Sequence, residues 1–471
     1  MNMVARAARR VLWLLAMLGA PLPAMADGLA VLDPIERPAF SDDWVRHTTR
    51  TAHADDMVFV VARTGKAACA PIRVQGARAT QWQMLPIETT VPSDDETAPG
   101  VFHEVLVPRS AHSCTASSYV LIEWRAGQGG PVGITQGTDK VVVDVRVVAG
   151  DPAARIPFLV GMNPANLVRG HCPDGHCPRE GELLRRYADL LNAHGLQPIQ
   201  TFVRFPPIRD GRLDLDAGHE TGTSFRQTVM DPAIHGRIGF PRASRYPDPE
   251  TYLKALQRTV VAEGLVGRAW VYAADEPRDI AALARTLTSD RIHSPDVAGM
   301  VTTNRDRRLA GLVDVYAPVF NHLVSARRPG FRAYAAGRGA PVGLWTYLSC
   351  AGSCGPNRAV RPDAPRVPGP ATGLADLLID RPAARLFDFF RTVSGRVDGL
   401  LYYEATESYR LVPMGIDIFR DTWSFGGNGD GLLVFPGRPG RFGLQAHVAL
   451  PSLRLKLLRH ALQNGRVRTQ H

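Results

Sequence analysis

The stretch that decides the fold is Arg268–Asp279, which reads RAWVYAADEPRD. Its first part, Ala269–Ala274, is a short apolar run of the kind that forms a fully buried strand. Two adjacent carboxylates, Asp275 and Glu276, end this run, and a helical pattern follows Pro277. Acids at the carboxyl end of a buried strand lie where an α/β barrel carries its active site. A purely structural role also fits, with Asp275 as a helix N-cap and Pro277 in the first helical turn.

Strand and helix patterns alternate on both sides of this stretch. The sequence predicts seven strands, at Ile156–Gly161, Pro198–Arg204, Ala269–Ala274, Val297–Thr303, Val313–Val319, Val342–Leu348 and Gly399–Glu404. Helical patterns occur at Glu180–His194, Glu250–Glu263, Asp279–Thr288, Pro382–Val393 and Pro451–Gln463. Such alternation indicates a parallel sheet with helices on its faces.

An eight-stranded barrel fits the length of residues 151–471. Ser224–Met230 or Leu432–Phe435 is expected to supply the eighth strand. An open, doubly wound sheet is the alternative, but no glycine-rich dinucleotide-binding or phosphate-binding motif follows a predicted strand. We therefore predict an α/β fold with a (β/α)8 TIM-like barrel, and we expect no cofactor.

Residues 27–150 have a different pattern. Short runs rich in Val, Ile, Phe and Tyr, such as Met57–Ala62 and Lys140–Val148, are separated by clusters of Gly, Pro, Ser and Asp. Several short strands with turn signals at this spacing predict a β-sandwich domain. No acid–His–nucleophile set occurs there, so we expect a supporting or sugar-contacting module in front of a catalytic domain at residues 151–471.

The first 26 residues have the pattern of a cleavable signal peptide. Arg6, Arg9 and Arg10 precede an apolar run at Val11–Gly19, and Ala24–Ala26 is a small-x-small cleavage site. The apolar run is too short to span a bilayer. These features predict a secreted or periplasmic bacterial protein without a membrane anchor.

Six cysteines in an exported chain predict disulfides. By proximity in sequence they fall into three pairs, which are Cys69 with Cys114, Cys172 with Cys177, and Cys350 with Cys354, and this is one of fifteen possible pairings. A metal site is the alternative, because His171–Cys177 contains two His and two Cys. Zinc sites usually take ligands from two separated clusters, and the sequence has no matching second cluster. We therefore predict disulfides and no metal.

The formal net charge is +10 at pH 7. Removing the three arginines of the predicted signal peptide, which contains no acids, leaves +7 (10 − 3). This charge is scattered, and there is no dense Lys/Arg tract. Nucleic-acid binding is therefore not expected.

Polar and aromatic residues gather at the ends of the predicted strands. This combination fits a sugar site, because aromatic rings stack on the apolar faces of sugars and polar groups bond to the hydroxyls. The alternative for each aromatic is a place in the core. The candidate substrate-binding residues at these ends are Arg204, Tyr316, Trp345, Tyr347, Tyr403 and Glu404.

Four segments of the chain, taken together, resemble glycoside hydrolase family 123 and the related domain of unknown function 4091. These segments are Tyr272–Pro277 (YAADEP), Leu344–Cys350 (LWTYLSC), Gly399–Ala405 (GLLYYEA) and Gly426–Gly437 (GGNGDGLLVFPG), the last followed by the helical pattern of Leu450–Leu462. We add Asn428, from the glycine-rich run, to the substrate-binding candidates. The chain departs from its relatives at Arg459–Asn464, which replaces an acidic run, and at Tyr403, where relatives often carry Trp.

The resemblance implies a retaining β-N-acetylhexosaminidase, similar to β-N-acetylgalactosaminidases, that acts on glycans with N-acetylhexosamine residues. In the mechanism it implies, the 2-acetamido oxygen of the substrate attacks C1. Asp275 would orient the acetamido group, and Glu276 would protonate the glycosidic oxygen. Adjacent residues of a strand face opposite ways, so we expect the chain to bend at Pro277. The alternatives are a non-catalytic carbohydrate-binding protein, a glycosidase with Glu404 or Glu407 as the partner acid, and a metal-dependent enzyme.

Overall fold

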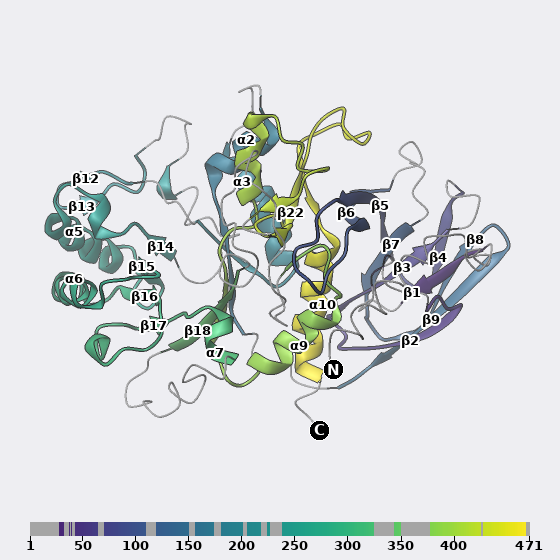
Figure 1. The fold of residues 1–471 in the computed structure, drawn as a ribbon, viewed down its shortest axis with the longest axis horizontal. Coiled ribbons are helices and arrows are strands. Elements are labelled where there is room, and N and C mark those ends of the chain that lie inside the picture. Colours follow the sequence, from purple (N-terminus) through teal and green to yellow (C-terminus); the bar gives the residue numbers. More distant parts are fainter. Residues whose placement is uncertain are drawn as a thin grey trace, which may run out of the picture.

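The protein was analysed as a computed structural model. It describes residues 28–32, 37, 39, 43–64, 70–109, 119–149, 156–173, 180–200, 205–217, 224–226, 238–324, 343–349, 377–424 and 427–467. The predicted signal peptide and Arg204 lie outside these residues. Figure 1 shows the two parts of the fold, a parallel sheet with its helices in teal and green, and the N-terminal sheets in purple and blue.

An eight-stranded parallel sheet curls into a nearly closed barrel. Its strands in spatial order are β11 (Gln197–Gln200), β10 (Phe158–Met162), β19 (Gly399–Tyr402), β18 (Gly343–Leu348), β17 (Val315–Tyr316), β16 (Ala298–Thr302), β15 (Ala269–Asp275) and β14 (Ile238–Phe240). All neighbouring strands are parallel. The edge strands β11 and β14 approach within 8 Å between Cα atoms, so the order around the barrel follows the chain. The α/β class and the parallel sheet are thus confirmed.

The α-helices are α2 (Pro164–His171), α3 (Glu180–Ala193), α5 (Pro249–Ala262), α6 (Ile280–His293), α7 (Phe320–Val324), α9 (Ala384–Val393) and α10 (Leu453–Val467), and the 3-10 helices are η1 (Ala243–Arg245), η2 (Arg307–Leu309) and η4 (Glu407–Met414). The helices α3, α5, α6, α9 and α10 lie close to where the sequence predicts them, whereas α2, α7 and the 3-10 helices were not predicted. Within the described residues, no helix is both long and apolar enough to cross a membrane.

The eighth barrel strand differs from the prediction. It is β14, whose three residues lie inside a stretch with a loop-like composition. The candidate Leu432–Phe435 overlaps β22 (Val434–Gly437), which pairs antiparallel with β23 (Val448–Pro451) outside the barrel. The described part of Ser224–Met230, residues 224–226, belongs to no strand of the barrel. A three-residue strand is too short to show a periodic pattern, which explains why β14 was not predicted.

Two sheets precede the barrel. One has the order β1 (Ala30–Leu32), β3 (Met57–Arg63), β7 (Tyr119–Arg125), β5 (Ala79–Thr89) and β6 (Gly100–Pro108), and the other has the order β2 (His47–Ala52), β9 (Asp139–Val147), β8 (Gly130–Gln136) and β4 (Ile72–Gln75). Apolar side chains of both sheets, such as Val60 and Val143, form one buried cluster. The β2–β9 pair is parallel, unlike the pairs of a purely antiparallel sandwich. The β-sandwich and the domain boundary at residue 150 stay predictions.

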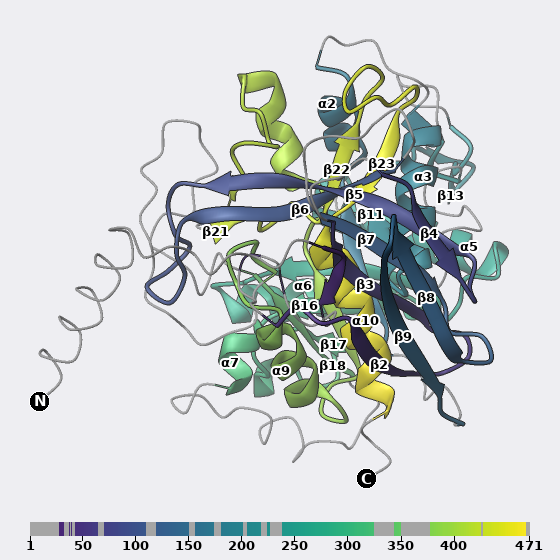
Figure 2. The same cartoon turned by 90° about the vertical axis from the view of Figure 1, so that its right-hand side faces the viewer.

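The last helix, α10, lies between the barrel and the five-stranded sheet (Figure 1, Figure 2). Leu455 and Leu458 share one buried cluster with Phe59 of β3 and with Phe389 of α9. On β3, Phe59 faces this cluster, whereas Val60 faces the second sheet. The run Met57–Ala62 (MVFVVA) is therefore apolar throughout because both faces of its sheet are covered.

Charged side chains of α10 are buried in the same contact. Lys456 and Arg459 bind the two carboxylate oxygens of Glu123 on β7, at 2.8 and 2.6 Å. Burial opposes ionisation of Glu123, but these two cations outweigh it and lower its pKa to about 2. Arg454 binds Glu104 of β6 at 2.5 Å. These residues join the C-terminal helix to the N-terminal sheet.

Other strand pairs are short. They comprise the hairpin of β12 (Ile208–Arg209) and β13 (Arg212–Leu213), and the pair of β20 (Trp423–Ser424) and β21 (Gly427–Asn428). The strand β21 belongs to the glycine-rich run, in which the Asn428 N–H donates to Ser93 Oγ, in the connection between β5 and β6.

Candidate active site

A β-bulge near the end of β15 turns Asp275 towards the barrel interior. Tyr272 pairs with Met300, but Asp275 pairs with Thr302, so β15 has one more residue than β16 between these pairs. Met300 and Tyr272 belong to the cluster that fills the interior. In a regular strand, Asp275 would face away from the side of Tyr272. The bulge reverses this, as bulges beside functional sites commonly do.

The backbone of Glu276 makes a second turn at the end of β15. Its φ is 41°, in the left-handed region. This conformation costs about 1–3 kcal/mol for a residue other than glycine, and a residue before proline also favours an extended backbone. The Glu276 N–H donates to Thr302 Oγ1 at 2.8 Å. The chain thus bends at Glu276 itself, one residue before the predicted bend at Pro277.

The N-cap of α6 is Asp279. Its side chain accepts a hydrogen bond from the N–H of Ala282 at 2.9 Å. Asp275 therefore does not cap this helix, and the capping interpretation of the acid pair is wrong. Asp275 and Glu276 are both exposed, so a ligand can reach them.

Two tyrosines bind the acid pair from different strands. The Tyr272 hydroxyl donates to Asp275 Oδ1 at 2.7 Å, and the Tyr347 hydroxyl donates to Glu276 Oε1 at 2.7 Å. Burial, followed by the charge of Asp275, raises the pKa of Tyr272 well above its ordinary value. The Tyr272 phenol therefore stays protonated and acts as a donor to the carboxylate.

Tryptophans form the floor beneath these tyrosines. Trp270 precedes Tyr272 by two residues on β15, and Trp345 precedes Tyr347 by two residues on β18, so each pair shares the interior face. Trp345 is only 3% exposed. A Cβ atom on Gly399 would lie 2.3 Å from its ring, so the indole is packed against the neighbouring strand. The structure places Tyr347 beside the acids and Trp345 in the floor.

The end of β19 adds two of the predicted residues. Burial raises the pKa of the Tyr403 phenol, and the charges of Glu407, Glu404 and Asp275 raise it further. Tyr403 therefore lies within electrostatic range of Asp275. Glu404 is fully buried and accepts hydrogen bonds from the N–H and the hydroxyl of Thr406, at 3.0 and 2.6 Å.

Glu407 is also buried, at the start of η4. It accepts a hydrogen bond from the side chain of Asn166 at 3.3 Å and lies 2.9 Å from Arg410 Nε. Burial raises the pKa of Glu407, against the opposing effect of Arg410. Glu404 and Glu407 are thus buried and bonded to their own neighbours, whereas Asp275 and Glu276 are exposed.

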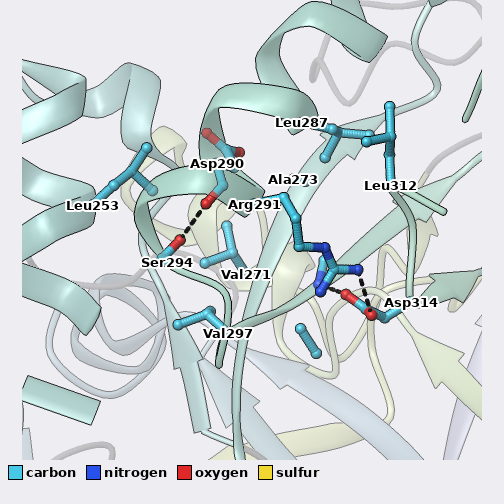
Figure 3. A pocket seen from close by; sticks show the side chains of 12 residues that line it. Leu253, Val271, Ala273, Leu287, Asp290, Arg291, Ser294, Val297, Leu312 and Asp314 are labelled. Atoms are coloured by element: carbon cyan, nitrogen blue, oxygen red, sulfur yellow. Dashed lines mark hydrogen bonds and ion pairs between the residues drawn. The ribbon is translucent and has the colours of Figure 1, made fainter. Parts of the chain in front are cut away.

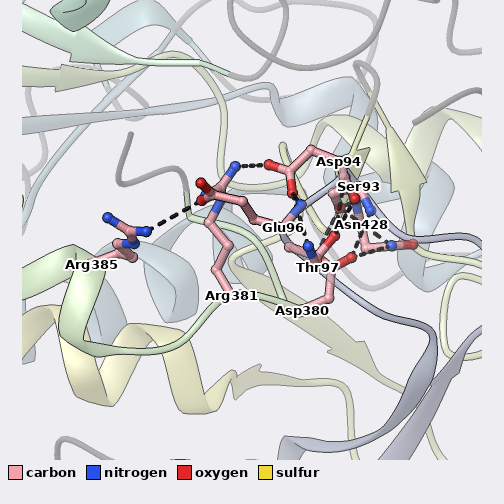
Figure 4. A network of polar contacts seen from close by, with 8 residues as sticks. All are labelled: Ser93, Asp94, Glu96, Thr97, Asp380, Arg381, Arg385 and Asn428. Atoms are coloured by element: carbon pink, nitrogen blue, oxygen red, sulfur yellow. Dashed lines mark hydrogen bonds and ion pairs between the residues drawn. The ribbon is translucent and has the colours of Figure 1, made fainter. Parts of the chain in front are cut away.

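Tyr316 and Asn428 are not brought to the acid pair. Tyr316 is 2% exposed and packs against Leu287 of α6, in the layer outside the barrel. The Asn428 side chain donates to the Val91 carbonyl at 2.8 Å and to Asp380 at 2.9 Å. Figure 4 shows this network at the contact with the N-terminal sheets.

The substrate-binding prediction omits three residues that the structure places at the site. Tyr272 and Thr302 bind Asp275, and the Arg242 guanidinium lies over the Tyr272 ring at 5.0 Å from its centroid. The two-residue spacing from Trp270 is a sequence signal for Tyr272. The position of Thr302 at the end of a strand is a weaker signal. Arg242 follows β14, which was not predicted, so no sequence pattern indicated that Arg242 lies at the site.

A separate depression lies on the outer side of β15 and β16, against α5 and α6. Figure 3 shows Val271 and Ala273 among its lining residues, and neither belongs to the cluster that fills the barrel interior. Burial raises the pKa of Asp290 in its lining to about 6. The depression contains neither acid of the pair.

The predicted Cys/His cluster is only partly described. Cys172 is disulfide-bonded, and the other five cysteines lie outside the described residues, so all three predicted pairings stay predictions. His171 contacts the Tyr187 hydroxyl at 2.8 Å and His447 Nδ1 at 3.2 Å. Among the described residues, no group of three or more His, Cys, Asp or Glu side chains is placed to hold a metal ion.

Comparisons with known proteins agree with the architecture. No protein-family model and no curated protein matches the chain. Among solved structures, the chain is similar to a family 123 glycoside hydrolase from Clostridium perfringens. The structure of that enzyme was determined to study its hydrolysis of glycolipid glycans. The TM-score is 0.60 at 10% identity, and the match covers 93% of this chain and 87% of the other. The chain therefore has the fold of a family 123 glycoside hydrolase over nearly its whole length.

Proposed function

We propose that this protein is a retaining glycoside hydrolase of the β-N-acetylhexosaminidase type, which acts on glycans with N-acetylhexosamine residues. One observation carries the proposal. Asp275 and Glu276 lie side by side, exposed, at the carboxyl end of a strand in a barrel of the family 123 fold. The bulge turns Asp275 to the face that carries Tyr272, and the left-handed backbone of Glu276 bends the chain directly after it. A regular strand would instead direct the two adjacent side chains to opposite faces.

The contacts of Asp275 suit it to orient the acetamido group. Tyr272 and Thr302 both lie within hydrogen-bond distance of its Oδ1. Oδ2 makes no hydrogen bond with a described residue, so it is available to accept one from the acetamido N–H of the substrate. Held in this way, the acetamido oxygen attacks C1 and forms an oxazolinium ion, whose positive charge the carboxylate stabilises.

Glu276 acts first as the general acid and then as the general base. Its Oε1 accepts the Tyr347 hydrogen bond, which leaves Oε2 for the glycosidic oxygen. The protonated Glu276 gives its proton to this oxygen as the bond to C1 breaks. The resulting carboxylate then removes a proton from water, which attacks C1 and reopens the oxazolinium ring. Two displacements at C1 give net retention of the anomeric configuration.

Glu404 and Glu407 suit the alternative of an ordinary carboxylate nucleophile less well. Glu404 is fully buried and bound to Thr406, and Glu407 is bound to Asn166 and Arg410. A nucleophile must reach C1 of the sugar, and neither side chain is exposed. The second alternative, a carbohydrate-binding protein without activity, predicts glycan binding with no turnover.

The test is an assay of the protein from residue 27 onward on 4-nitrophenyl β-N-acetylgalactosaminide and β-N-acetylglucosaminide. We expect turnover with retention, observed by NMR of the first anomer formed. We expect Glu276→Gln to abolish most of it, because the variant has no proton to give. Glu250→Gln, on the exposed face of α5, is the matched control and should be as active as the wild type. An undiminished rate in Glu276→Gln, or inversion at C1, would contradict the proposal.

Export belongs to the same proposal. An N-terminal signal peptide would deliver the enzyme to the periplasm or the medium, where glycans are encountered and disulfides form. The N-terminal sheets would support the catalytic domain, with no membrane anchor and no nucleic-acid partner. N-terminal sequencing of the protein recovered outside the cytoplasm is expected to begin near Asp27. Recovery of the whole protein in the cytoplasm with Met1 retained would contradict export.

A further inference from the structure

We propose that Thr302 is a positioning residue, which holds the two adjacent carboxylates in their working arrangement through a single hydroxyl group. The proposal rests on the proposed function, because it assigns Asp275 and Glu276 to the reaction. Thr302 ends β16, the strand next to β15, and is only 4% exposed. It lies beneath the acid pair and does not compete with a ligand for the space above it.

The Thr302 hydroxyl contacts both acids. Its oxygen accepts the Glu276 N–H at 2.8 Å and lies 3.0 Å from Asp275 Oδ1. The Tyr272 hydroxyl and the Ala274 carbonyl are farther away, at 3.2 and 3.4 Å. The hydroxyl has one proton, and the nearer, charged acceptor is Asp275. The group therefore accepts from the backbone of one acid and donates to the side chain of the other.

Each of the two tyrosines donates a hydrogen bond to one acid, whereas Thr302 connects the two acids. Tyr272 donates to Asp275, and Tyr347 donates to Glu276. Thr302 bonds to both acids. A change in the Thr302 hydroxyl is thus expected to affect both carboxylates, whereas a change in either tyrosine affects one of them first.

The backbone of Glu276 explains why such a tether is needed. A left-handed φ of 41° before a proline is not an intrinsic preference of glutamate. The hydrogen bond from its N–H to Thr302 opposes relaxation towards the extended region. Such a relaxation would carry the Glu276 carboxyl away from Asp275. Thr302 therefore acts through the other two residues and needs no contact with the substrate.

The test compares Thr302→Val, which keeps the shape and removes the hydroxyl, with Thr302→Ser, which keeps the hydroxyl. We expect kcat of Thr302→Val to fall by about 10- to 100-fold with KM within about threefold, because hydrogen bonds to charged groups are of that strength. Thr302→Ser should stay within about fivefold of the wild type in kcat. Equal losses in both variants, or wild-type kcat in Thr302→Val, would overturn the proposal.

A second readout separates positioning from general damage to the structure. Loss of a well-placed proton donor slows substrates with poor leaving groups more than activated ones. The loss in Thr302→Val should therefore be larger on phenyl than on 4-nitrophenyl glycosides, by at least threefold. Thermal unfolding of each variant checks the fold. If Thr302→Val does not fold, Thr302→Ala takes its place with the same expectations.

Crystal structures of the variants make the test independent of turnover. We expect Glu276 to leave the left-handed region in Thr302→Val and to keep it in Thr302→Ser. An unchanged Glu276 backbone in Thr302→Val overturns the positioning role, whatever the activity. Absence of turnover in the wild type on every glycoside would instead count against the proposed function, and the structures would still decide the role of Thr302.

Discussion

Tyr347 reaches across the barrel to Glu276. The tyrosine lies on β18 and the glutamate directly follows β15, with β16 and β17 between these strands in the sheet. Their 2.7 Å hydrogen bond fixes one oxygen of the carboxyl group and so the direction in which the other points. In the proposed function Glu276 is the general acid, whose proton has to be aimed at the leaving oxygen, so we expect this contact across the barrel to affect the chemical step.

Replacing Tyr347 with Phe should lower kcat about 10-fold or more, because Glu276 loses the donor that orients it. KM is expected to change less, since the phenol binds the enzyme's own carboxyl group. Steady-state kinetics on phenyl and 4-nitrophenyl glycosides measure both. Tyr119→Phe, in the N-terminal sheet, is the control. Unchanged kcat in Tyr347→Phe would show that this hydrogen bond has no part in the reaction.

Replacing Asn428 with Ala tests whether this residue binds sugar or joins the domains. Its amide is buried between Val91 and Asp380. We expect the free energy of unfolding to fall by about 1–3 kcal/mol, because the partner groups are left buried without it. KM should stay at the wild-type value. Urea unfolding and kinetics give the two quantities, and a raised KM with unchanged stability would restore Asn428 to the sugar site.

Replacing Glu123 with Gln should lower the free energy of unfolding at pH 7 by roughly 3–5 kcal/mol, because Lys456 and Arg459 stay buried without their counter-charge. The exposed pair of Arg125 and Asp55 offers a matched control. Asp55→Asn is expected to change stability by about 1 kcal/mol at most. A loss in Glu123→Gln as small as that of the control would contradict the interpretation.

The same residue predicts a dependence on pH. The folded pKa of Glu123, about 2, lies below its ordinary value of 4.5. Its contribution to stability is therefore fully present above pH 4.5 and is lost as the pH falls through the folded value. The wild type should lose more stability than Glu123→Gln between pH 5 and pH 2, as measured by urea unfolding. Parallel curves for the two proteins would exclude this contribution.

His171 predicts acid sensitivity at a higher pH. Burial, followed by the charges of His447 and Arg438, lowers its pKa from 6.5 to about 3. Between these values the unfolded chain binds a proton that the folded chain does not, so stability falls as the pH falls. His171→Gln should reduce this slope by up to about 1.4 kcal/mol per pH unit. His47→Gln, at an exposed histidine, is the control, and an unchanged slope in His171→Gln contradicts the prediction.

The barrel strands could largely be predicted, because buried parallel strands are short apolar runs, such as Ala269–Ala274. The acid pair could be placed at a strand end by the same pattern. The bulge in β15 and the left-handed Glu276 could not be, since periodicity describes regular strands. Yet these two irregularities set the directions of the two acids.

Two candidates show why composition alone does not assign a side chain to a site. Tyr316 and Tyr347 both lie on barrel strands, but β17 has only two paired residues, so the inward face could not be inferred from alternation. Asn428 is held by a hydrogen bond from its backbone N–H to Ser93 Oγ, and Ser93 is 335 residues away in sequence. No local pattern carries information about such a distant partner.

The position of α10 has a consequence for synthesis of the chain on the ribosome. The N-terminal sheets emerge first, and nascent domains generally begin to fold in that order. One face of the five-stranded sheet, however, is covered by residues of Leu453–Val467, which are translated after every strand of the barrel. Until then that apolar face is open to water or to a chaperone, and the buried acids Glu104 and Glu123 lack the cations supplied by this helix. Translation of the last helix therefore sets the earliest moment at which either part of the molecule can be complete.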